Sequence, residues 1–188
     1  EERVYKDWLT YQEAEKAVLR VRERHVKSND SYFKLIPYFN SSLSTQRINW
    51  HIKQLKREGW VPEAVVVDYA DILKMPKEYK EHRDQTNEIW KRLRAISQEH
   101  HCLVVTASQT NAASFKADLL TKSHFSEDRR KLDHAVGVVG INATADDREQ
   151  GLCRLNWINL RDRAYNETKC CYVAGCFSVS NPAIKSVW

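Results

Sequence analysis

The apolar run Ala64–Val67, followed directly by Asp68, constrains the fold of this chain more than any other feature. Such a run is typical of a buried parallel strand, and the acid after it is typical of a strand that delivers a carboxylate to a metal–phosphate site. A second apolar run, Cys102–Ala107, ends in Ser108 and Gln109. Open α/β sheets bind ligands beyond the carboxyl ends of their strands, so we expect these polar residues to lie in one crevice.

A helical pattern lies between the two runs. Within Glu88–His101, the apolar residues Ile89, Leu93 and Ile96 recur at i, i+4 and i+7, which is the spacing of one face of an α-helix. Strand, helix and strand in this order predict a βαβ unit with parallel strands and a right-handed crossover.

The rest of the chain adds elements around this unit. No repeat, low-complexity tract or Pro/Gly-rich linker divides it, so we expect a single domain over residues 1–188. Periodicity and capping residues predict helices over Val4–Val26, Ser44–Gly59 and Ser126–Leu132, and strands over Tyr32–Phe39, Ala135–Ile141, Leu152–Leu160 and Lys169–Val179. Loops or turns are predicted over Met75–Arg83, Thr110–Phe125, Asn142–Gln150 and Arg161–Thr168.

Composition narrows the class of protein. An apolar content of 42% supports a packed core and excludes a disordered chain, and the sequence lacks an apolar run long enough to span a membrane. No signal-peptide pattern opens the sequence. The five cysteines lack C-x-x-C spacing, which indicates reduced thiols in a cytosolic protein instead of a zinc site or disulfides. The net charge of +5 is compatible with nucleic-acid binding and with many other functions.

The order of five segments resembles RecA-fold replicative helicases of the DnaB type, particularly phage-like versions. The resemblance covers roughly residues 54–173 and rests on "VVVDYADIL", "NEIWKRLRAIS", "CLVVTASQTN", "HFSEDRRKLDHAVGVVGIN" and "LNWINLRDRAYNE". It implies an α/β fold that is part of a RecA-like P-loop NTPase, with a mostly parallel sheet flanked by helices and a C-terminal antiparallel hairpin. It also implies a ring-shaped homo-hexamer that hydrolyses nucleotide at subunit interfaces, translocates on single-stranded DNA and unwinds duplex.

The phosphate-binding motif of that family, G-x-x-x-x-G-K-S/T, is absent from this sequence. The resemblance implies that the P-loop strand and the strand with the catalytic Glu would precede Glu1. We therefore expect this chain to be the C-terminal part of an ATPase core that is inactive alone. A natural domain that lost the P-loop is the other interpretation.

The resemblance also assigns roles at the two strand ends. Asp68 matches the Walker B acid, which would hold Mg²⁺ through water because Mg²⁺ prefers oxygen ligands and keeps several waters. Gln109 matches the polar residue that senses the γ-phosphate or the attacking water, since an amide both donates and accepts hydrogen bonds. The alternatives are an Asp68 that caps the next turn and a Gln109 that is an ordinary loop residue.

Arg161 and Arg163 match the paired basic residues that the family projects into the nucleotide site of a neighbouring subunit. A guanidinium suits this role because it stays charged and grips phosphate oxygens in a fork. Alternating positions in an extended segment would put both side chains on one face. The family often has Lys at the first position and Asn-Gly after the second, and this sequence departs from both; Asp162 could instead pair with a neighbouring arginine.

Basic residues fall where the family has a DNA-facing loop. Arg129, Arg130 and Lys131 would hold phosphates without reading sequence, with Lys116 and Lys122 as further candidates. The alternative is that these side chains are ordinary solvated surface, because acidic residues surround them.

The implied cofactors are Mg²⁺ and ATP or another NTP. The implied partners are single-stranded DNA, further copies of the chain, and a primase or a loader, in the cytoplasm of a bacterium or phage-infected host or in an organelle matrix. Three alternatives remain open: a RecA-fold ATPase that is not a helicase (recombinase-like or clock-type), a P-loop-less module that binds single-stranded DNA or a partner, and an unrelated α/β enzyme.

Overall fold

The computed structural model describes residues 16, 33–75, 79–110, 114, 117–125, 130–176 and 181–187, with the backbone alone for 175–176 and 181–187. The helix predicted over Val4–Val26 lies outside this part of the chain, apart from Lys16, which is helical. None of the described helices is long and apolar enough to cross a membrane.

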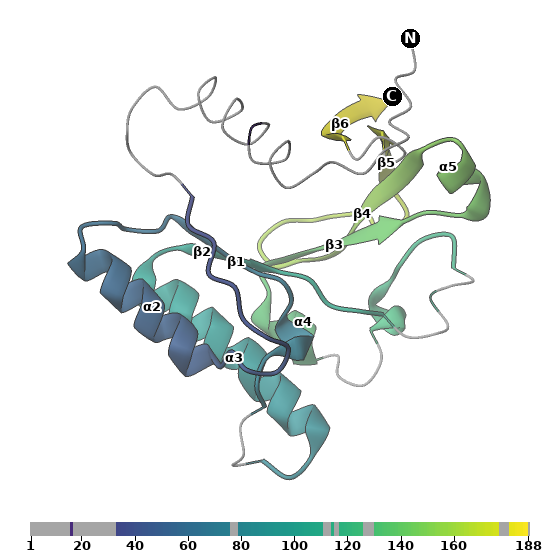
Figure 1. Ribbon diagram of the computed structural model, residues 1–188. Helices are drawn as coiled ribbons and strands as arrows, with labels where there is room; N and C mark the ends of the chain where they lie inside the picture. Colours follow the sequence, from purple (N-terminus) through teal and green to yellow (C-terminus); the bar gives the residue numbers. More distant parts are fainter. Residues whose placement is uncertain are drawn as a thin grey trace.

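The predicted βαβ unit is present. Strand β1 (Ala64–Val67) pairs in parallel with β2 (Leu103–Thr106), and helix α3 (His82–His100) makes the crossover between them. Helix α2 (Thr45–Arg57) lies beside α3 (Figure 1). Both helices pack against β1 and the turn after it, in a core formed by Ile48, Ile52, Val67, Ala70, Leu73, Ile89, Leu93 and Ile96.

The ends of the helices follow from local chemistry. Ser44 caps α2 through its side-chain oxygen, which accepts from the backbone N–H of Arg47 at 3.2 Å, and Gly59 ends the segment with a φ of 84°. This confirms the helix predicted over Ser44–Gly59. Helix α3 begins at His82, six residues before the predicted start, because its first turns are polar and bury only Thr86.

The parallel strands are buried on one face only within the described residues. Their other face exposes Val66, Leu103 and Val105, with 73%, 62% and 43% of their surface accessible. The expectation of a fully buried strand pair is therefore wrong for this part of the chain, although the alternation explains why both strands are apolar throughout.

A second, antiparallel sheet follows in the order β3-β4-β5-β6. Its strands are β3 (Gly137–Asn142), β4 (Leu152–Leu160), β5 (Cys170–Cys176) and β6 (Asn181–Val187). The predicted C-terminal hairpin corresponds to β4 and β5, and β6 was not predicted. The described part of the chain therefore has two parallel and four antiparallel strands, not a mostly parallel sheet.

Smaller elements also differ from the predictions. Residues 33–39 contain no strand, although one was predicted over Tyr32–Phe39. The predicted turn Asn142–Gln150 contains helix α5 (Ala145–Glu149), whose capping box is made by Thr144 and Asp147. Helix α4 (Arg130–His134) coincides with the end of the predicted short helix, and a 3₁₀ turn occupies Lys122–His124 within the predicted loop.

A buried amide pair fixes the antiparallel sheet to the preceding loop. Asn142 Nδ2 donates to Asn156 Oδ1 at 2.9 Å, and the two side chains hold both backbone groups of Leu120, from N–H to Asn142 Oδ1 at 2.6 Å and from Asn156 Nδ2 to its carbonyl at 2.9 Å. Asn156 Nδ2 also donates to the carbonyl of Glu167. Buried amides are stable only when paired in this way, so this site tolerates little displacement.

Gly140 leaves room for that pair, and adding a methyl group there tests how rigid it is. A Cβ would lie 2.5 Å from Asn156 Oδ1 and 2.9 Å from Ile158 Cδ1, so Gly140→Ala should destabilise the fold by about 1–3 kcal/mol. The matched control is Gly137→Ala on the same strand, where the nearest atom is a Trp157 ring carbon at 3.2 Å, and it should change stability by less than about 1 kcal/mol. Urea unfolding measures both; equal effects would mean that the amide pair yields.

Three histidines predict a loss of stability in mild acid. His100 Nε2 donates to Asn49 Oδ1 at 2.6 Å between α3 and α2, and burial lowers the pKa of the imidazole, as it does for His51 and His134. Nearby Lys56 lowers the pKa of His100 further, while Glu99 opposes this. The folded protein therefore favours the neutral rings, and their contribution is complete above the unfolded pKa of about 6.5 and is lost as pH falls below it.

The expected result is a lower urea midpoint at pH 5.5 than at pH 7.5. His100→Gln should flatten part of this dependence, because its amide can still donate to Asn49 but does not titrate. The carboxylates with lowered pKa titrate in more acidic solution and do not contribute in this window. A midpoint that is constant across this range would contradict the interpretation.

Candidate functional site

The parallel register places the loop after β1 beside the loop after β2. Val67 is the partner of Thr106, so both strands end at the same edge of the sheet. The Thr106 hydroxyl donates to the Val67 carbonyl at 2.8 Å and accepts from the backbone N–H of Ala70 at 2.8 Å. One side chain therefore fixes the turn after β1 to the end of β2.

Asp71 is the centre of this edge. Its Oδ2 accepts from the Ser108 hydroxyl at 2.8 Å and from the backbone N–H of Gln109 at 3.3 Å, and its Oδ1 pairs with Lys131 Nζ at 2.9 Å. Lys131 is buried, with 11% of its side chain exposed, and its ammonium group also lies 6.0 Å from the centre of the Trp90 ring. The carboxylate thus joins three separate segments of the chain.

The two predicted strand-end residues lie at this edge. Asp68 follows β1 directly and its side chain is exposed, and the peptide bond between Asp68 and Tyr69 is cis. Gln109 Nε2 donates to the Tyr69 hydroxyl at 3.1 Å, which orients the amide across the two loops. Sequence reasoning missed Asp71 and Ser108, although Asp71 lies only one turn beyond Asp68 in the same segment.

No cluster of three or more His, Cys, Asp or Glu side chains that could hold a metal ion occurs in the described ranges. Asp68 has no hydrogen-bond or ion-pair partner there, whereas Asp71 is engaged by three donors. Within this part of the chain, the edge therefore offers a cation a single exposed carboxylate. That fits a hydrated Mg²⁺ whose remaining ligands are waters and phosphate oxygens, and it does not fit an all-protein metal site.

Arg161 and Arg163 follow β4 and differ in their surroundings. The guanidinium of Arg161 donates to the carbonyl of Asp133 in α4, and its backbone N–H donates to the Val136 carbonyl at 2.8 Å. Arg163 is exposed and has no polar partner among the described residues. Residues 161–163 form a bend, so the prediction that both side chains share the face of an extended segment does not apply.

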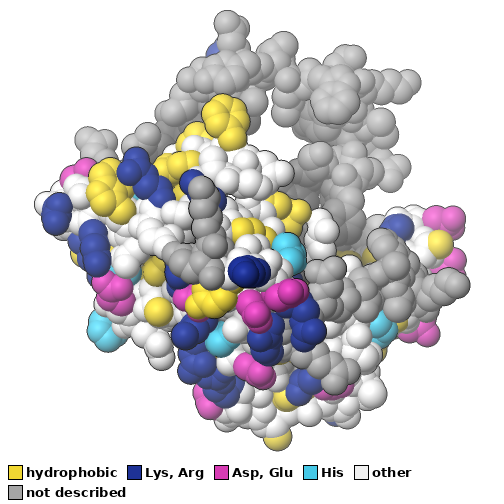
Figure 2. Space-filling view, turned by 90° about the horizontal axis from the view of Figure 1, so that it is seen from below, with side chains coloured by type: hydrophobic (Ala, Val, Ile, Leu, Met, Phe, Trp, Pro, Cys, Tyr) yellow, Lys and Arg dark blue, Asp and Glu magenta, His cyan; other side chains and the backbone are white. Residues whose placement is uncertain are grey.

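The predicted DNA-facing basic residues also differ from one another. Arg130 pairs with Asp84 of α3 at 3.0 Å, and Lys131 points into the fold toward Asp71. Arg129 and Lys116 lie outside the described residues. On the face seen in Figure 2, basic and acidic side chains are intermixed over the described surface and do not form one continuous basic patch.

Lys122 is the most exposed of the described candidates. Its ammonium group lies 5.6 Å from the Tyr165 ring centre and 4.0 Å from a Glu167 oxygen. A hydrogen bond with Tyr165 is the main cause that raises the pKa of Lys122, so the side chain carries its full charge.

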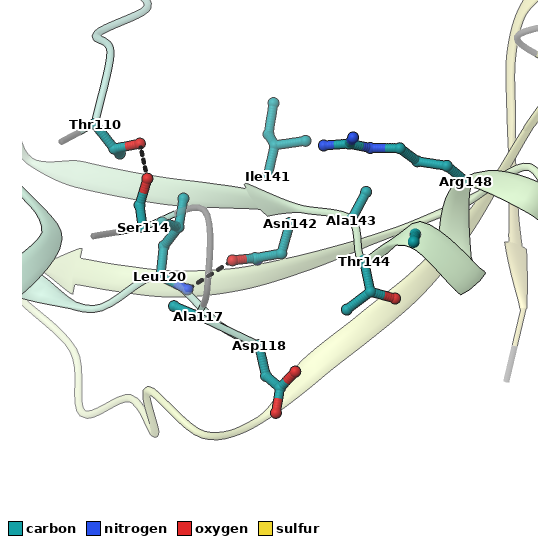
Figure 3. Close-up of a pocket in the computed structure, with 11 residues that line it drawn as sticks. Thr110, Ser114, Ala117, Asp118, Leu120, Ile141, Asn142, Ala143, Thr144 and Arg148 are labelled. Atoms are coloured by element: carbon teal, nitrogen blue, oxygen red, sulfur yellow. Dashed lines mark hydrogen bonds between the residues drawn. The ribbon is translucent and has the colours of Figure 1, made fainter. Parts of the chain in front are cut away.

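A pocket of about 290 Å³ opens next to this edge, between the segment after Gln109 and the end of β3 (Figure 3). Its lining is largely polar, with Arg148 and Asp118 as the charged groups, and Asn142 projects into it from β3. It is lined by Thr110, Ser114, Ala117, Asp118, Leu120, Ile141, Asn142, Ala143, Thr144, Ala145 and Arg148. The pocket begins one residue after Gln109, so a movement of Gln109 would reach it directly.

The sequence matches one family over residues 9–118, described as "DnaB-like helicase C terminal domain". A search of curated proteins found no match. Among solved structures, an isolated ATPase domain has a TM-score of 0.66 at 17% identity, and the match covers 78% of this chain and 52% of that one. "The Structure Of A DnaB-Like Replicative Helicase And Its Interactions With Primase" has a TM-score of 0.66 at 18% identity, and the match covers 90% of this chain and 41% of that one.

The chain therefore spans about half, or less, of the solved structures that it matches. At these identities the likeness concerns the fold. It confirms the predicted fold class, a RecA-like α/β domain with antiparallel strands at its C-terminal end.

Proposed function

This chain belongs to the DnaB-like helicase C-terminal domain family, and we propose that it is the C-terminal part of the motor core of a replicative DNA helicase, forming a single domain. The observation that carries the proposal is the shared edge of β1 and β2. It brings an exposed acid and an amide side chain together on loops that Thr106 and Asp71 hold in place. Nucleotide-driven motors need this combination of a metal-binding carboxylate and a sensor on the next strand.

Asp68 is the residue we assign to Mg²⁺ and ATP. A hard cation takes oxygen ligands, and an exposed carboxylate can hold its water shell without leaving other acids unpaired. When bound, the metal would neutralise charge that develops on the phosphates. The strand holds this carboxylate at a fixed position, since the backbone of β1 is paired with β2 up to the preceding residue.

Gln109 is the residue we assign to sensing the phosphate. Its side-chain amide donates to Tyr69 and its backbone N–H donates to Asp71, so the side chain can change partner while the backbone stays anchored. An amide can donate to a phosphate oxygen or orient a water. The segment that follows it lines the neighbouring pocket, which supports a role in passing this change onward.

Arg163 is the better candidate for a residue that acts on a neighbouring subunit. Arg161 is already held by the Asp133 carbonyl within its own chain, whereas Arg163 is exposed and available. Within this proposal the intact protein is a homo-hexamer that translocates on single-stranded DNA. Arg129, Arg130, Lys116 and Lys122 remain proposed DNA contacts, and the primase named for one solved relative supports a primase as a partner.

Replacing the exposed acid tests the proposal. In the full-length protein, Asp68→Asn should lower the rate of nucleotide hydrolysis about 100-fold or more, because metal coordination contributes several kcal/mol to the transition state. The fold should survive, since the side chain lies outside the core. Asp146→Asn, an exposed acid on α5, is the matched control and should keep normal turnover. Normal turnover by Asp68→Asn would favour an unrelated α/β enzyme.

A mixing experiment tests whether Arg163 acts between subunits. Arg163→Ala should reduce turnover by about 10³-fold, the usual effect of losing an arginine finger. Mixing Arg163→Ala subunits with Asp68→Asn subunits should restore part of the turnover, because some interfaces then combine an intact acid with an intact arginine. Each variant alone is the control. A mixture as inactive as its components would place Arg163 outside the neighbour's site, and strand displacement by the wild-type protein separates a helicase from other RecA-fold ATPases.

A further inference from the structure

Helix α4 joins the nucleotide edge to the segment that carries the arginines. It lies where the helical side of the molecule meets the antiparallel sheet (Figure 1). Lys131 extends from it to Asp71 at the edge, and the carbonyls of Leu132 and Asp133 accept from Asn159 and Arg161 of the β4 end. One turn of helix therefore contacts both proposed parts of the catalytic machinery.

The third side of α4 is fixed to α3. Arg130 pairs with Asp84, and His134 Nε2 donates to Asn87 Oδ1 at 3.0 Å. Arg94 also donates to the Asp133 carbonyl, at 3.3 Å. Because α3 is the crossover helix of the βαβ unit, α4 cannot shift without breaking contacts to the rigid core.

The charge pair between Lys131 and Asp71 is built for position. Lys131 is 9% exposed, and its ammonium group lies 2.9 Å from Asp71 Oδ1 and 3.4 Å from the Ser108 hydroxyl. If Lys131 left to bind a DNA phosphate, a half-buried carboxylate would lose its counter-charge, which is costly. The same carboxylate receives the backbone N–H of Gln109.

Resting on the proposed function, we propose that Lys131 is a positioning residue: through Asp71 it sets the place of Gln109, and through α4 it ties that place to Arg161 and so to the arginine segment. A change at the phosphate sensor is then felt at the residues that face the neighbouring subunit. Lys131 is not a DNA contact in this arrangement, in contrast to the role that its place in a basic run predicts.

Hydrogen exchange in the full-length protein tests the link without requiring turnover. Lys131→Met, which keeps the length of the chain and removes the charge, should speed exchange of the Gln109 amide about tenfold, and it should also speed exchange of the Arg161 amide, which donates to Val136. Lys122→Met removes an exposed lysine and should change neither amide. Unchanged exchange at Gln109, or acceleration confined to Gln109, would overturn the proposal.

Two further variants separate position from a general loss of folding. Asp71→Asn combined with Lys131→Met leaves no unpaired charge and should unfold at a urea concentration closer to wild type than Lys131→Met alone. Lys131→Arg keeps the charge and should keep exchange at Gln109 slower than Lys131→Met. A double variant that is less stable than both single variants would contradict the pairing.

Turnover and DNA binding give the last discrimination. Lys131→Met should lower kcat about tenfold and leave affinity for an oligothymidylate within about twofold, because the ammonium group meets an acid and not a phosphate. Reduced affinity with a smaller salt dependence and normal kcat would make Lys131 a DNA contact and overturn the proposal. A wild-type protein that hydrolyses no nucleotide would refute the proposed function alone, since the exchange measurements would still decide the role of Lys131.

Discussion

The parallel pairing of β1 with β2 is the constraint on which the rest of this structure depends. It runs in register from Ala64 opposite Leu103 to Val67 opposite Thr106, and α3 makes the connection between the strands. Parallel strands that begin together end together, so the loops that follow them meet at one edge without any further design. Everything proposed for the site, from the exposed acid to the sensor amide, uses that coincidence of strand ends.

Two buried polar networks hold the irregular segments onto this frame. The Asp71 carboxylate gathers donors from the loop after β2 and from α4, and the amides of Asn142 and Asn156 hold the backbone of Leu120 against the antiparallel sheet. In each case a side chain supplies the hydrogen bonds that a loop cannot make with itself. The first network lies beside the candidate site and the second lines the neighbouring pocket, so loops that could move are anchored at single points.

The regular part of the fold could be predicted from the sequence because its signals are local. The apolar runs of β1 and β2 and the Ser44 cap of α2 each declare themselves within a few residues. The start of α3 could not be predicted in this way, since its first turns bury only one polar residue. The Asp71 network was invisible for another reason: its partners lie 37 and 60 residues away along the chain, and nothing local distinguishes a lysine that pairs inside from one that faces solvent.

The burial of Lys131 also bears on how the protein responds to ionic strength. Mobile ions screen exposed charges within about 8 Å at physiological salt, whereas a pair withdrawn from solvent is screened far less. Contacts between surface lysines or arginines and a phosphate backbone weaken as salt rises, but the link between Lys131 and Asp71, with 11% and 22% of the side chains exposed, should persist. Salt would then release this protein from a polyanion while leaving the geometry of its β1–β2 edge intact.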